Sequence, residues 1–266
     1  MNRAWRPSRR TVVYAAVAVA SALLADALLV EPQRLEVRRA QITVGVHAPL
    51  TIAHLSDLHT HAYGGLERRL TEAVRAAHPD VIVVTGDVVD DGALEPARET
   101  FEHLEAPLGV WVVRGNWENW RPPPGERAFY ESVGAHLLVN EGALVRDDVW
   151  IAGTDDPMSG AASFDAALRD APRGTTKIAL FHSPEAFDRV ATRFDVAFAG
   201  HTHGGQIRLP FAGPLWLPRG SGRFVDGWYE SGKARMFVSR GVGTSILPLR
   251  FNCAPEIAIV TLATGP

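Results

Sequence analysis

Five short groups of potential metal ligands are spread over the middle of the 266-residue chain. Each group follows an apolar run, and together the groups supply seven Asp, His and Asn side chains. They are Asp57-Leu58-His59, Gly86-Asp87, Gly115-Asn116, His182 and Gly200-His201-Thr202-His203. Carboxylate and imidazole groups are common ligands of manganese, iron and zinc. The residue types therefore predict a site for divalent metal ions.

Two metal ions held side by side need a ligand that both share, and a carboxylate has two oxygens for this purpose. Asp87 is the natural bridging ligand, because the apolar run before it indicates a central strand. A glycine precedes Asp87, Asn116 and His201. Glycine allows the backbone to turn sharply, so that the next side chain can face the metals. We therefore expect Asp87 to lie between the two ions.

The apolar runs before the five groups are typical of buried strands. They cover Thr51 to Leu55, Val81 to Thr85, Val110 to Arg114, Lys177 to Phe181 and Val196 to Ala199. In an open α/β sheet, the carboxyl ends of the strands line the functional crevice. We therefore expect all five groups to meet at one edge of one sheet.

The rest of the chain after residue 35 alternates helical and strand-like segments. Apolar spacing predicts helices over Leu66 to Ala77 and Leu94 to Leu104, and a strand over Leu35 to Val46. Further strands are expected at Val149 to Ala152, Met236 to Ser239 and Ile257 to Leu262. The pattern indicates an α/β fold with a β-rich C-terminal third, in one domain over residues 35–266.

The bulk composition excludes few classes of protein, and it is consistent with one large folded domain. The chain is 46% hydrophobic, which suffices for a substantial core. A net charge of −3 gives no sign of a nucleic-acid-binding surface, and we expect no nucleic acid partner. The single cysteine, Cys253, cannot form an intramolecular disulfide, so cysteine content does not decide the compartment.

Residues 1–34 differ from the rest of the chain and predict a hydrophobic helix that acts as a signal anchor or export signal. Four arginines, Arg3, Arg6, Arg9 and Arg10, precede an almost wholly apolar run from Thr11 to Val30. About 20 apolar residues suffice to cross a bilayer as a helix.

A signal anchor that keeps the arginines on the cytoplasmic side is favoured over the alternatives. Adjacent arginines before an apolar run also resemble a twin-arginine export signal, and Ala25-Asp26-Ala27 has the form of a cleavage site. We expect a cell-membrane location with the domain on the outer side, or alternatively an exported protein.

The ordered set Asp-x-His, Gly-Asp, Gly-Asn, His and Gly-His-x-His, over residues 57–203, resembles the calcineurin-like metallophosphoesterase family. The segments Ser239 to Thr244, Pro248 to Arg250 and Pro255 to Ile257 are similar to a bacterial membrane-associated or exported branch, which includes enzymes that act on UDP-diacylglucosamine. The resemblance implies a four-layer α/β/β/α sandwich and a metal-dependent phosphoesterase.

The resemblance also implies a role for each of the seven residues. Asp57, His59 and His203 would bind one metal; Asn116, His182 and His201 would bind the other; Asp87 would bridge them. Asp87, Asn116 and His201 are the implied catalytic residues. The family's two divalent ions (manganese, zinc or iron here) would hold a hydroxide that attacks phosphorus in line.

One position departs from the family pattern. The family usually continues Gly-Asn-His after the third strand, and that histidine contacts the phosphate. Here the position is Trp117. An indole cannot act as an acid near neutral pH, although its N–H can donate one hydrogen bond. We therefore expect Trp117 to bind substrate, and the change mildly favours a substrate with a good leaving group.

Three functions follow as alternatives. The first is a phosphodiesterase or pyrophosphatase that acts at a membrane surface on a phosphorylated small molecule or lipid-linked substrate. The second is a general phosphomonoesterase or nucleotide phosphatase, and the third is a metal-bound scaffold without turnover. A lipid preference would appear as an exposed apolar patch beside the metals. The segment Leu209 to Trp216 is the candidate for that patch.

Overall fold

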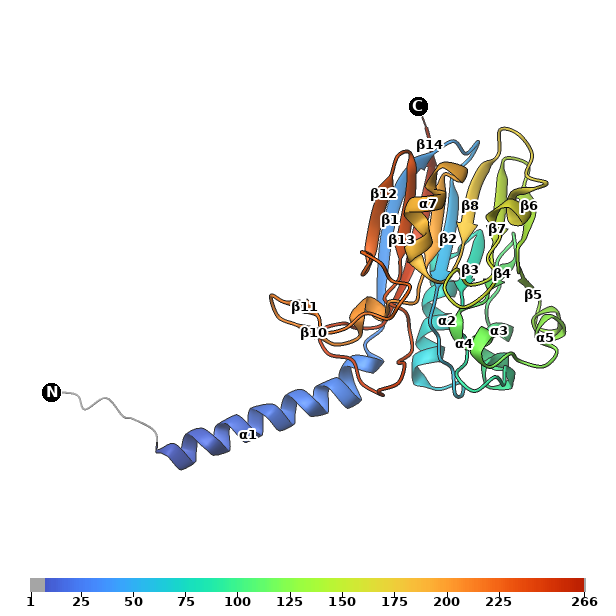
Figure 1. Ribbon diagram of the computed structural model, residues 1–266. Helices are drawn as coiled ribbons and strands as arrows, with labels where there is room; N and C mark the ends of the chain where they lie inside the picture. The colour runs from blue at the N-terminus through green and yellow to red at the C-terminus, as the bar shows by residue number, and fades with distance from the viewer. Residues whose placement is uncertain (1–7, 266) are drawn as a thin grey trace.

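The computed structural model describes residues 8–265 and contains two β-sheets of six strands each (Figure 1). The first sheet has the order β1-β14-β2-β3-β4-β5, and the second has the order β12-β13-β9-β8-β7-β6. An α/β fold was therefore predicted correctly. The expectation that one sheet carries all the ligand groups was wrong, because an apolar run indicates burial but not the sheet to which a strand pairs.

The strands of the first sheet are mostly parallel. They are β1 (Glu36–Val44), β2 (Leu50–Leu55), β3 (Val81–Thr85), β4 (Val110–Val113), β5 (Ala135–Leu137) and β14 (Glu256–Thr264). Strand β14 runs parallel to β1 and antiparallel to β2. All five residues of β3 are buried, as expected for a central strand covered on both faces.

The second sheet consists of β6 (Glu141–Arg146), β7 (Val149–Gly153), β8 (Thr176–Leu180), β9 (Val196–Ala199), β12 (Gly227–Ser231) and β13 (Ala234–Val238). Strands β7, β8, β9 and β13 are parallel, and the two edge strands are antiparallel to their neighbours. A separate hairpin is formed by β10 (Arg208–Leu209) and β11 (Gly213–Pro214).

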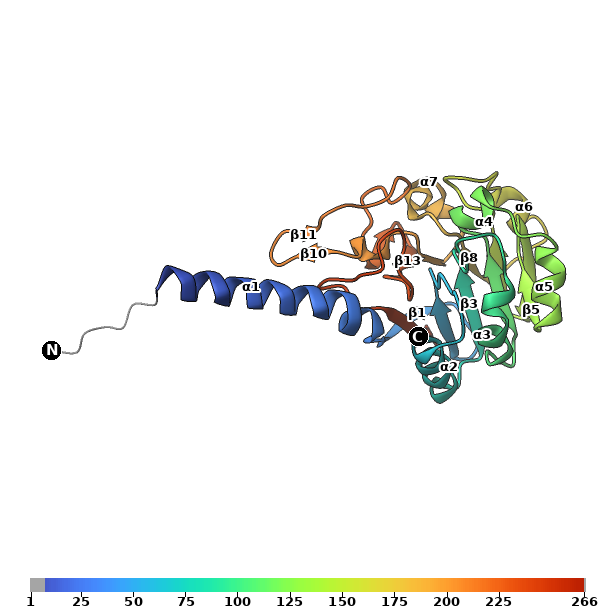
Figure 2. The ribbon, with the colours of Figure 1, turned by 90° about the horizontal axis from the view of Figure 1, so that it is seen from below.

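The two sheets pack face to face, and their inner faces share one hydrophobic core. Ile52 and Val83 from the first sheet meet Ile178 and Phe198 from the second in this core. A second core lies between the first sheet and its helices, and a third lies between the second sheet and its helices. These helices are α2 (Gly65–Ala77), α3 (Arg98–Glu102), α4 (Asn116–Trp120) and α5 (Glu126–Ser132) for the first sheet, and α6 (Phe164–Leu168) and α7 (Phe187–Val190) for the second. The result is a four-layer α/β/β/α sandwich (Figure 2).

The predicted elements agree with the structure in position, with small shifts at their ends. Helix α2 buries Leu66, Leu70 and Val74, which recur every fourth residue and form one apolar stripe. The helix expected over Leu94 to Leu104 is shorter: a 3₁₀ turn at Glu95–Ala97 leads into α3. Pro96 in this turn lacks the N–H that a regular helix needs.

The N-terminal segment forms a long helix that projects from the domain (Figure 1). Helix α1 (Arg9–Ala25) continues through a π turn (Asp26–Val30) and a 3₁₀ turn (Glu31–Gln33). Among the described residues, this stretch of 25 is the one helix long and apolar enough to cross a membrane. Arg3 and Arg6 of the predicted positive cluster lie outside the described residues.

Candidate metal centre

The seven predicted ligands come together at the carboxyl ends of strands from both sheets. Strands β2, β3 and β4 are parallel neighbours, and they are followed by Asp57 and His59, by Asp87 and by Asn116, respectively. Strands β8 and β9 are parallel neighbours in the other sheet, and they are followed by His182 and by His201 and His203. All seven residues are buried. The site therefore lies where the two sheets meet at their carboxyl ends.

The ligands form two clusters, each of which could hold one ion. Asp57, His59 and His203 make up one, and Asp87, His182 and His201 make up the other. In the first, His203 Nε2 lies 3.2 Å from Asp57 Oδ1 and 3.1 Å from His59 Nε2. Ligands about 2.0–2.2 Å from one ion lie roughly 3 Å from each other, so these separations suit a shared cation.

Asp87 lies between the two clusters, and Asn116 adjoins the second. One carboxylate oxygen, Asp87 Oδ2, lies 3.0 Å from His182 Nε2 and 3.9 Å from His59 Nε2. Asn116 Oδ1 lies 3.1 Å from His182 Nε2 and 2.7 Å from His201 Nδ1. The geometry thus places Asp87 between the clusters and Asn116 beside His182 and His201, in the arrangement expected for one bridging and one terminal ligand.

The hydrogen bonds of two histidines direct their lone pairs toward the centre. His182 Nδ1 lies 2.6 Å from the carbonyl oxygen of Thr85, and His201 Nε2 lies 2.7 Å from that of Arg219. A carbonyl only accepts, so these nitrogens carry the protons. In the neutral form that binds a metal ion, the other nitrogens, His182 Nε2 and His201 Nδ1, therefore face the oxygen of Asn116 with their lone pairs. Acceptors that converge without a donor need a cation, so the donor set fits divalent metal ions.

Charge within the cluster shifts the pKa values of its members. Burial lowers the pKa of His182, but the carboxylates of Asp87 and Asp57 outweigh burial and raise it well above its usual value. Burial raises the pKa of Asp57, but His203, His182 and His59 outweigh burial and lower it. Histidine protons and metal ions therefore compete to neutralise the same carboxylates.

The backbone at the site is strained in a way that turns the side chains inward. Five of the seven ligands have positive φ angles, between 44° and 72°, a region that non-glycine residues seldom occupy. They are Asp57, His59, Asp87, His201 and His203. The left-handed conformation at each strand end directs the side chain away from the strand axis and toward the other ligands.

The glycines before the ligands have two different roles. Gly86 has a φ of 83°, so it supplies the sharp turn that the sequence predicted. Gly200 is needed for space: a Cβ there would lie 1.8 Å from Ser56 Oγ and 2.4 Å from Asp57 Oδ2. The prediction of a sharp turn was therefore incomplete, because close packing against Asp57 also requires glycine.

Three acidic residues support the ligands, and their roles were not predicted from the sequence. Asp90 accepts a hydrogen bond from His59 Nδ1. Asp156 accepts from the backbone N–H of Ser183, next to His182. Asp156 follows β7, so the rule of polar residues after buried strands could have found it. Asp90 and Glu118 carried no such signal.

Glu118 is completely enclosed behind Asp87. Its carboxylate accepts hydrogen bonds from the backbone N–H groups of Asp87, Val88 and Gly115 at 2.7–2.9 Å. Burial and the charge of Asp87 raise the pKa of Glu118 to about 7. Glu118 therefore fixes the backbone that carries the predicted bridging ligand.

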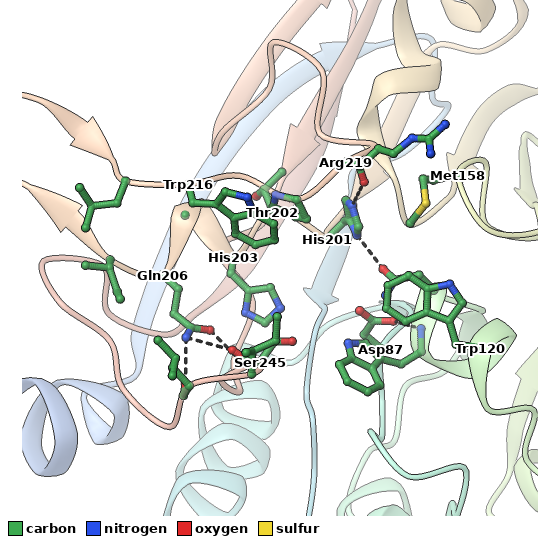
Figure 3. Close-up of a pocket in the computed structure, with 18 residues that line it drawn as sticks. Asp87, Trp120, Met158, His201, Thr202, His203, Gln206, Trp216, Arg219 and Ser245 are labelled. Carbon is green, nitrogen blue, oxygen red and sulfur yellow. Dashed lines mark hydrogen bonds between the residues drawn. The ribbon is translucent and has the colours of Figure 1, made fainter.

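A cavity of about 690 Å³ opens beside the clusters. Asp87, Asn116, His201 and His203 form its buried floor, and its walls include the aromatic residues Trp117, Trp120 and Trp216. Figure 3 shows Trp120 on the side of Asp87 and Trp216 on the side of His203. Trp117, predicted to bind substrate, lines this cavity, and its backbone N–H donates to Asp87 Oδ1 at 2.9 Å.

The calcineurin-like phosphoesterase family model matches residues 50–205, more than half of the chain. The uncharacterized metallophosphoesterase YkuE of Bacillus subtilis is 31% identical over 229 residues, which cover 79% of this chain and 78% of that protein. Phosphodiesterase YaeI of Escherichia coli is 28% identical over 232 residues, which cover 81% of this chain and 83% of that protein.

Two further proteins resemble this chain, one in sequence and one in fold. The zebrafish transmembrane protein with metallophosphoesterase domain is 28% identical over 236 residues, 80% of this chain and 53% of that protein. The crystal structure of the 5'-nucleotidase precursor from Thermus thermophilus superposes with a TM-score of 0.50 at 16% identity, over 81% of this chain and 54% of that one. The chain belongs to the calcineurin-like phosphoesterase family and is a hydrolase of phosphoester bonds.

Proposed function

We propose that the protein is a phosphodiesterase or pyrophosphatase that hydrolyses a lipid-linked or other phosphorylated substrate at a membrane surface. The observation that carries this proposal is the composition of the cavity. Its floor holds the metal ligands, whereas its exposed part is formed by apolar residues, among them Leu215, Trp216, Ile246 and Leu247. A phosphate at the floor and an apolar group at the mouth would match both surfaces.

Different groups of residues would have different roles in the proposed hydrolysis. Asp57, His59 and His203 would hold one ion, Asn116, His182 and His201 the other, and Asp87 both. When bound, two divalent ions (we propose manganese, zinc or iron) lower the pKa of water and neutralise charge on the phosphoryl oxygens. Asp90, Glu118 and Asp156 keep the ligands in place, so that little reorganisation is needed during the reaction.

Arg219 is the candidate for an additional phosphate contact. Among the described residues that line the cavity, it is the one arginine or lysine. Its carbonyl oxygen also fixes His201, which couples the position of this residue to the ligand. A guanidinium can bind phosphate oxygens in a bidentate manner, and in this chain the family's phosphate-contacting histidine is replaced by Trp117.

We further propose that α1 anchors the protein in the cell membrane with the catalytic domain on the outer side. The arginines before the apolar segment support this orientation, because positive residues are retained in the cytoplasm. Protease treatment of intact cells tests it: the domain should be digested from outside. Protection until the membrane is opened would contradict the proposed orientation.

The proposed activity is tested by manganese-dependent hydrolysis of three substrates by the purified full chain. These are a chromogenic phosphodiester, a chromogenic phosphomonoester and a UDP-linked diacyl lipid. Asp87→Ala should abolish turnover of the preferred substrate, whereas Asp170→Ala should not, because it removes an exposed carboxylate that belongs to neither ligand cluster and does not line the cavity.

The substrate ranking separates the alternatives. Preference for the diester or the lipid supports the proposal, and preference for the monoester would favour a general phosphatase. Bound metal without turnover of any substrate would indicate a scaffold and would contradict the proposed catalysis.

A further inference from the structure

Exposed large apolar side chains are concentrated on two parts of the molecule. One part is the N-terminal helical segment up to Val30. The other, called here the apolar rim, consists of Leu209, Phe211, Leu215 and Trp216 around the β10–β11 hairpin and Ile246 and Leu247 in the loop before β14. Elsewhere in the described chain, only Val37, Trp120 and Leu144 are large, apolar and exposed. Patches of this kind mark surfaces that contact another molecule or a membrane.

The two loops of the apolar rim are held together by the side chain of Gln206. Its Nε2 donates to the carbonyl oxygens of Ser245 and Leu247 at 3.2 and 2.9 Å, and its Oε1 accepts from the backbone N–H of Ser245 at 2.9 Å. The hairpin and the second loop therefore form one connected surface. Four of its six residues also line the cavity, so the rim surrounds the cavity mouth.

The end of the apolar helical segment is attached directly to the same region. The backbone N–H of Arg250 donates to the carbonyl oxygen of Ala27 at 3.0 Å. The buried carboxylate of Glu31 accepts from the backbone N–H groups of Asn252, at 2.8 Å, and Cys253. These contacts leave no flexible linker between the helix and the loop that carries Ile246 and Leu247. The helix therefore determines the distance of the rim from the membrane.

The hairpin projects in the same direction as the helix. Both views of the ribbon show β10 and β11 extending from the domain alongside the C-terminal part of α1 (Figures 1 and 2). The 25-residue helical stretch is about 37 Å long at 1.5 Å per residue, compared with about 30 Å for the hydrocarbon core of a bilayer. A bilayer that encloses α1 would thus reach the tip of the hairpin.

Two residues of the rim have left-handed backbone conformations. Phe211 and Ile246 have φ angles of 68° and 65°, which are unfavourable for bulky side chains. Phe211 is fully exposed and Ile246 is 80% exposed. Strain of this type persists at functional positions, and here it occurs at the two most exposed side chains of the rim.

We propose that the apolar rim inserts into the acyl layer of the membrane that α1 spans, so that the cavity opens toward lipid. Trp216 suits the boundary between acyl chains and head groups, because its ring is apolar and its N–H is polar. Arg69, which donates to the carbonyl oxygen of Gln33 at the end of the helical stretch, can contact anionic head groups. That substrates reach the metals from the bilayer rests on the proposed hydrolysis, whereas insertion of the rim rests only on the proposed anchoring by α1.

Insertion is tested by placing a fluorescent probe at the tip of the hairpin. The full chain carrying Phe211→Cys is labelled with an environment-sensitive dye and reconstituted in vesicles of phosphatidylethanolamine and phosphatidylglycerol. Leu144→Cys is the matched control, because Leu144 is an exposed apolar residue on β6, on the side of the domain away from α1 (Figure 1). The native Cys253 is buried, so the unsubstituted protein reports background labelling.

We expect blue-shifted emission at position 211, with quenching by lipids that carry a nitroxide on the acyl chain, and neither effect at position 144. Equal, water-like spectra at both positions would overturn the proposal. This result does not depend on turnover, so it is separate from any failure of the proposed activity.

A second measurement uses activity. Phe211→Asp and Leu144→Asp should both hydrolyse a soluble chromogenic substrate in detergent at the unsubstituted rate, since neither residue lines the cavity. Hydrolysis of a vesicle-embedded lipid substrate should fall several-fold for Phe211→Asp only. An equal rate for both variants on vesicles would overturn delivery of substrate from the bilayer.

Discussion

His59 donates its Nδ1–H to the carboxylate of Asp90, and its other ring nitrogen, Nε2, lies 3.1 Å from Nε2 of His203. The acceptor on one side of the ring therefore determines that the lone pair on the other side points into the metal cluster. A carboxylate behind a metal-binding histidine also increases the basicity of the ligand. Asp90 thus acts on the metal site through His59.

Replacing Asp90 with alanine should weaken metal binding without unfolding the domain. Loss of an outer carboxylate of this kind typically costs about 10–100-fold in metal affinity or activity. Asp91→Ala is the matched control, since the neighbouring Asp91 is exposed and its carboxylate accepts a hydrogen bond from the backbone N–H of Ala93 in its own loop. Isothermal titration with manganese measures the effect. Equal affinities for the two variants would contradict the role assigned to Asp90.

Replacing Trp117 with histidine should restore an acid at the cavity wall. The imidazole can protonate a leaving oxygen, and general acid catalysis typically contributes about 10²–10⁴-fold. We therefore expect the variant to accelerate hydrolysis of esters with poor, alkyl leaving groups more than that of nitrophenyl esters. Rates across a series of leaving groups measure this difference. A uniform change across the series would mean that position 117 does not deliver a proton.

Metal affinity should increase with pH, because metal ions must displace protons from the histidine ligands. Burial lowers the pKa of His182, but Asp87 and Asp57 raise it well above the usual value of 6.5; the pKa of His59 is also raised, with Asp90 and Asp87 overcoming burial. A raised pKa means that the proton is retained to higher pH, so competition persists above neutrality. Manganese titrations at several pH values measure the trend. A flat profile from acid to mildly alkaline pH would contradict it.

Arg250 should be essential for stability. It is fully buried, and its guanidinium donates to the backbone carbonyls of Arg240, Gly241, Gly243 and Cys253 at 2.5–3.1 Å. Arg250→Met leaves these buried oxygens without partners, at about 1–3 kcal/mol each.

We expect Arg250→Met to lower the free energy of unfolding by more than about 3 kcal/mol relative to the unsubstituted protein. Urea denaturation of both proteins measures this difference. Arg173→Met is the control: Arg173 is exposed, so its replacement should change the free energy of unfolding little. The loop held by Arg250 donates from Gly243 N to Asp57 O at 2.7 Å, so metal affinity should fall together with stability.

The sequence was sufficient to identify the residues that meet at the metal centre. Val81 to Thr85 is a continuous apolar run, so it had to be a strand buried on both faces, and Asp87 had to emerge at its end. The same local reasoning located β2, β4, β8 and β9. Short strands such as β5 and β12 were not found, because their apolar residues are too few to form a pattern.

The sequence alone indicated which Asp, His and Asn residues come together, and that the apolar N-terminal segment is a helix, since both depend on local residue types and spacing. Only the tertiary structure decided that the ligands come from two facing sheets, that Asp90 and Glu118 support them, and that the apolar rim lies beside α1. These relationships join residues distant in sequence, such as Ala27 and Arg250. Strand periodicity shows which residues are buried, but pairing and packing between elements decide which neighbours they meet.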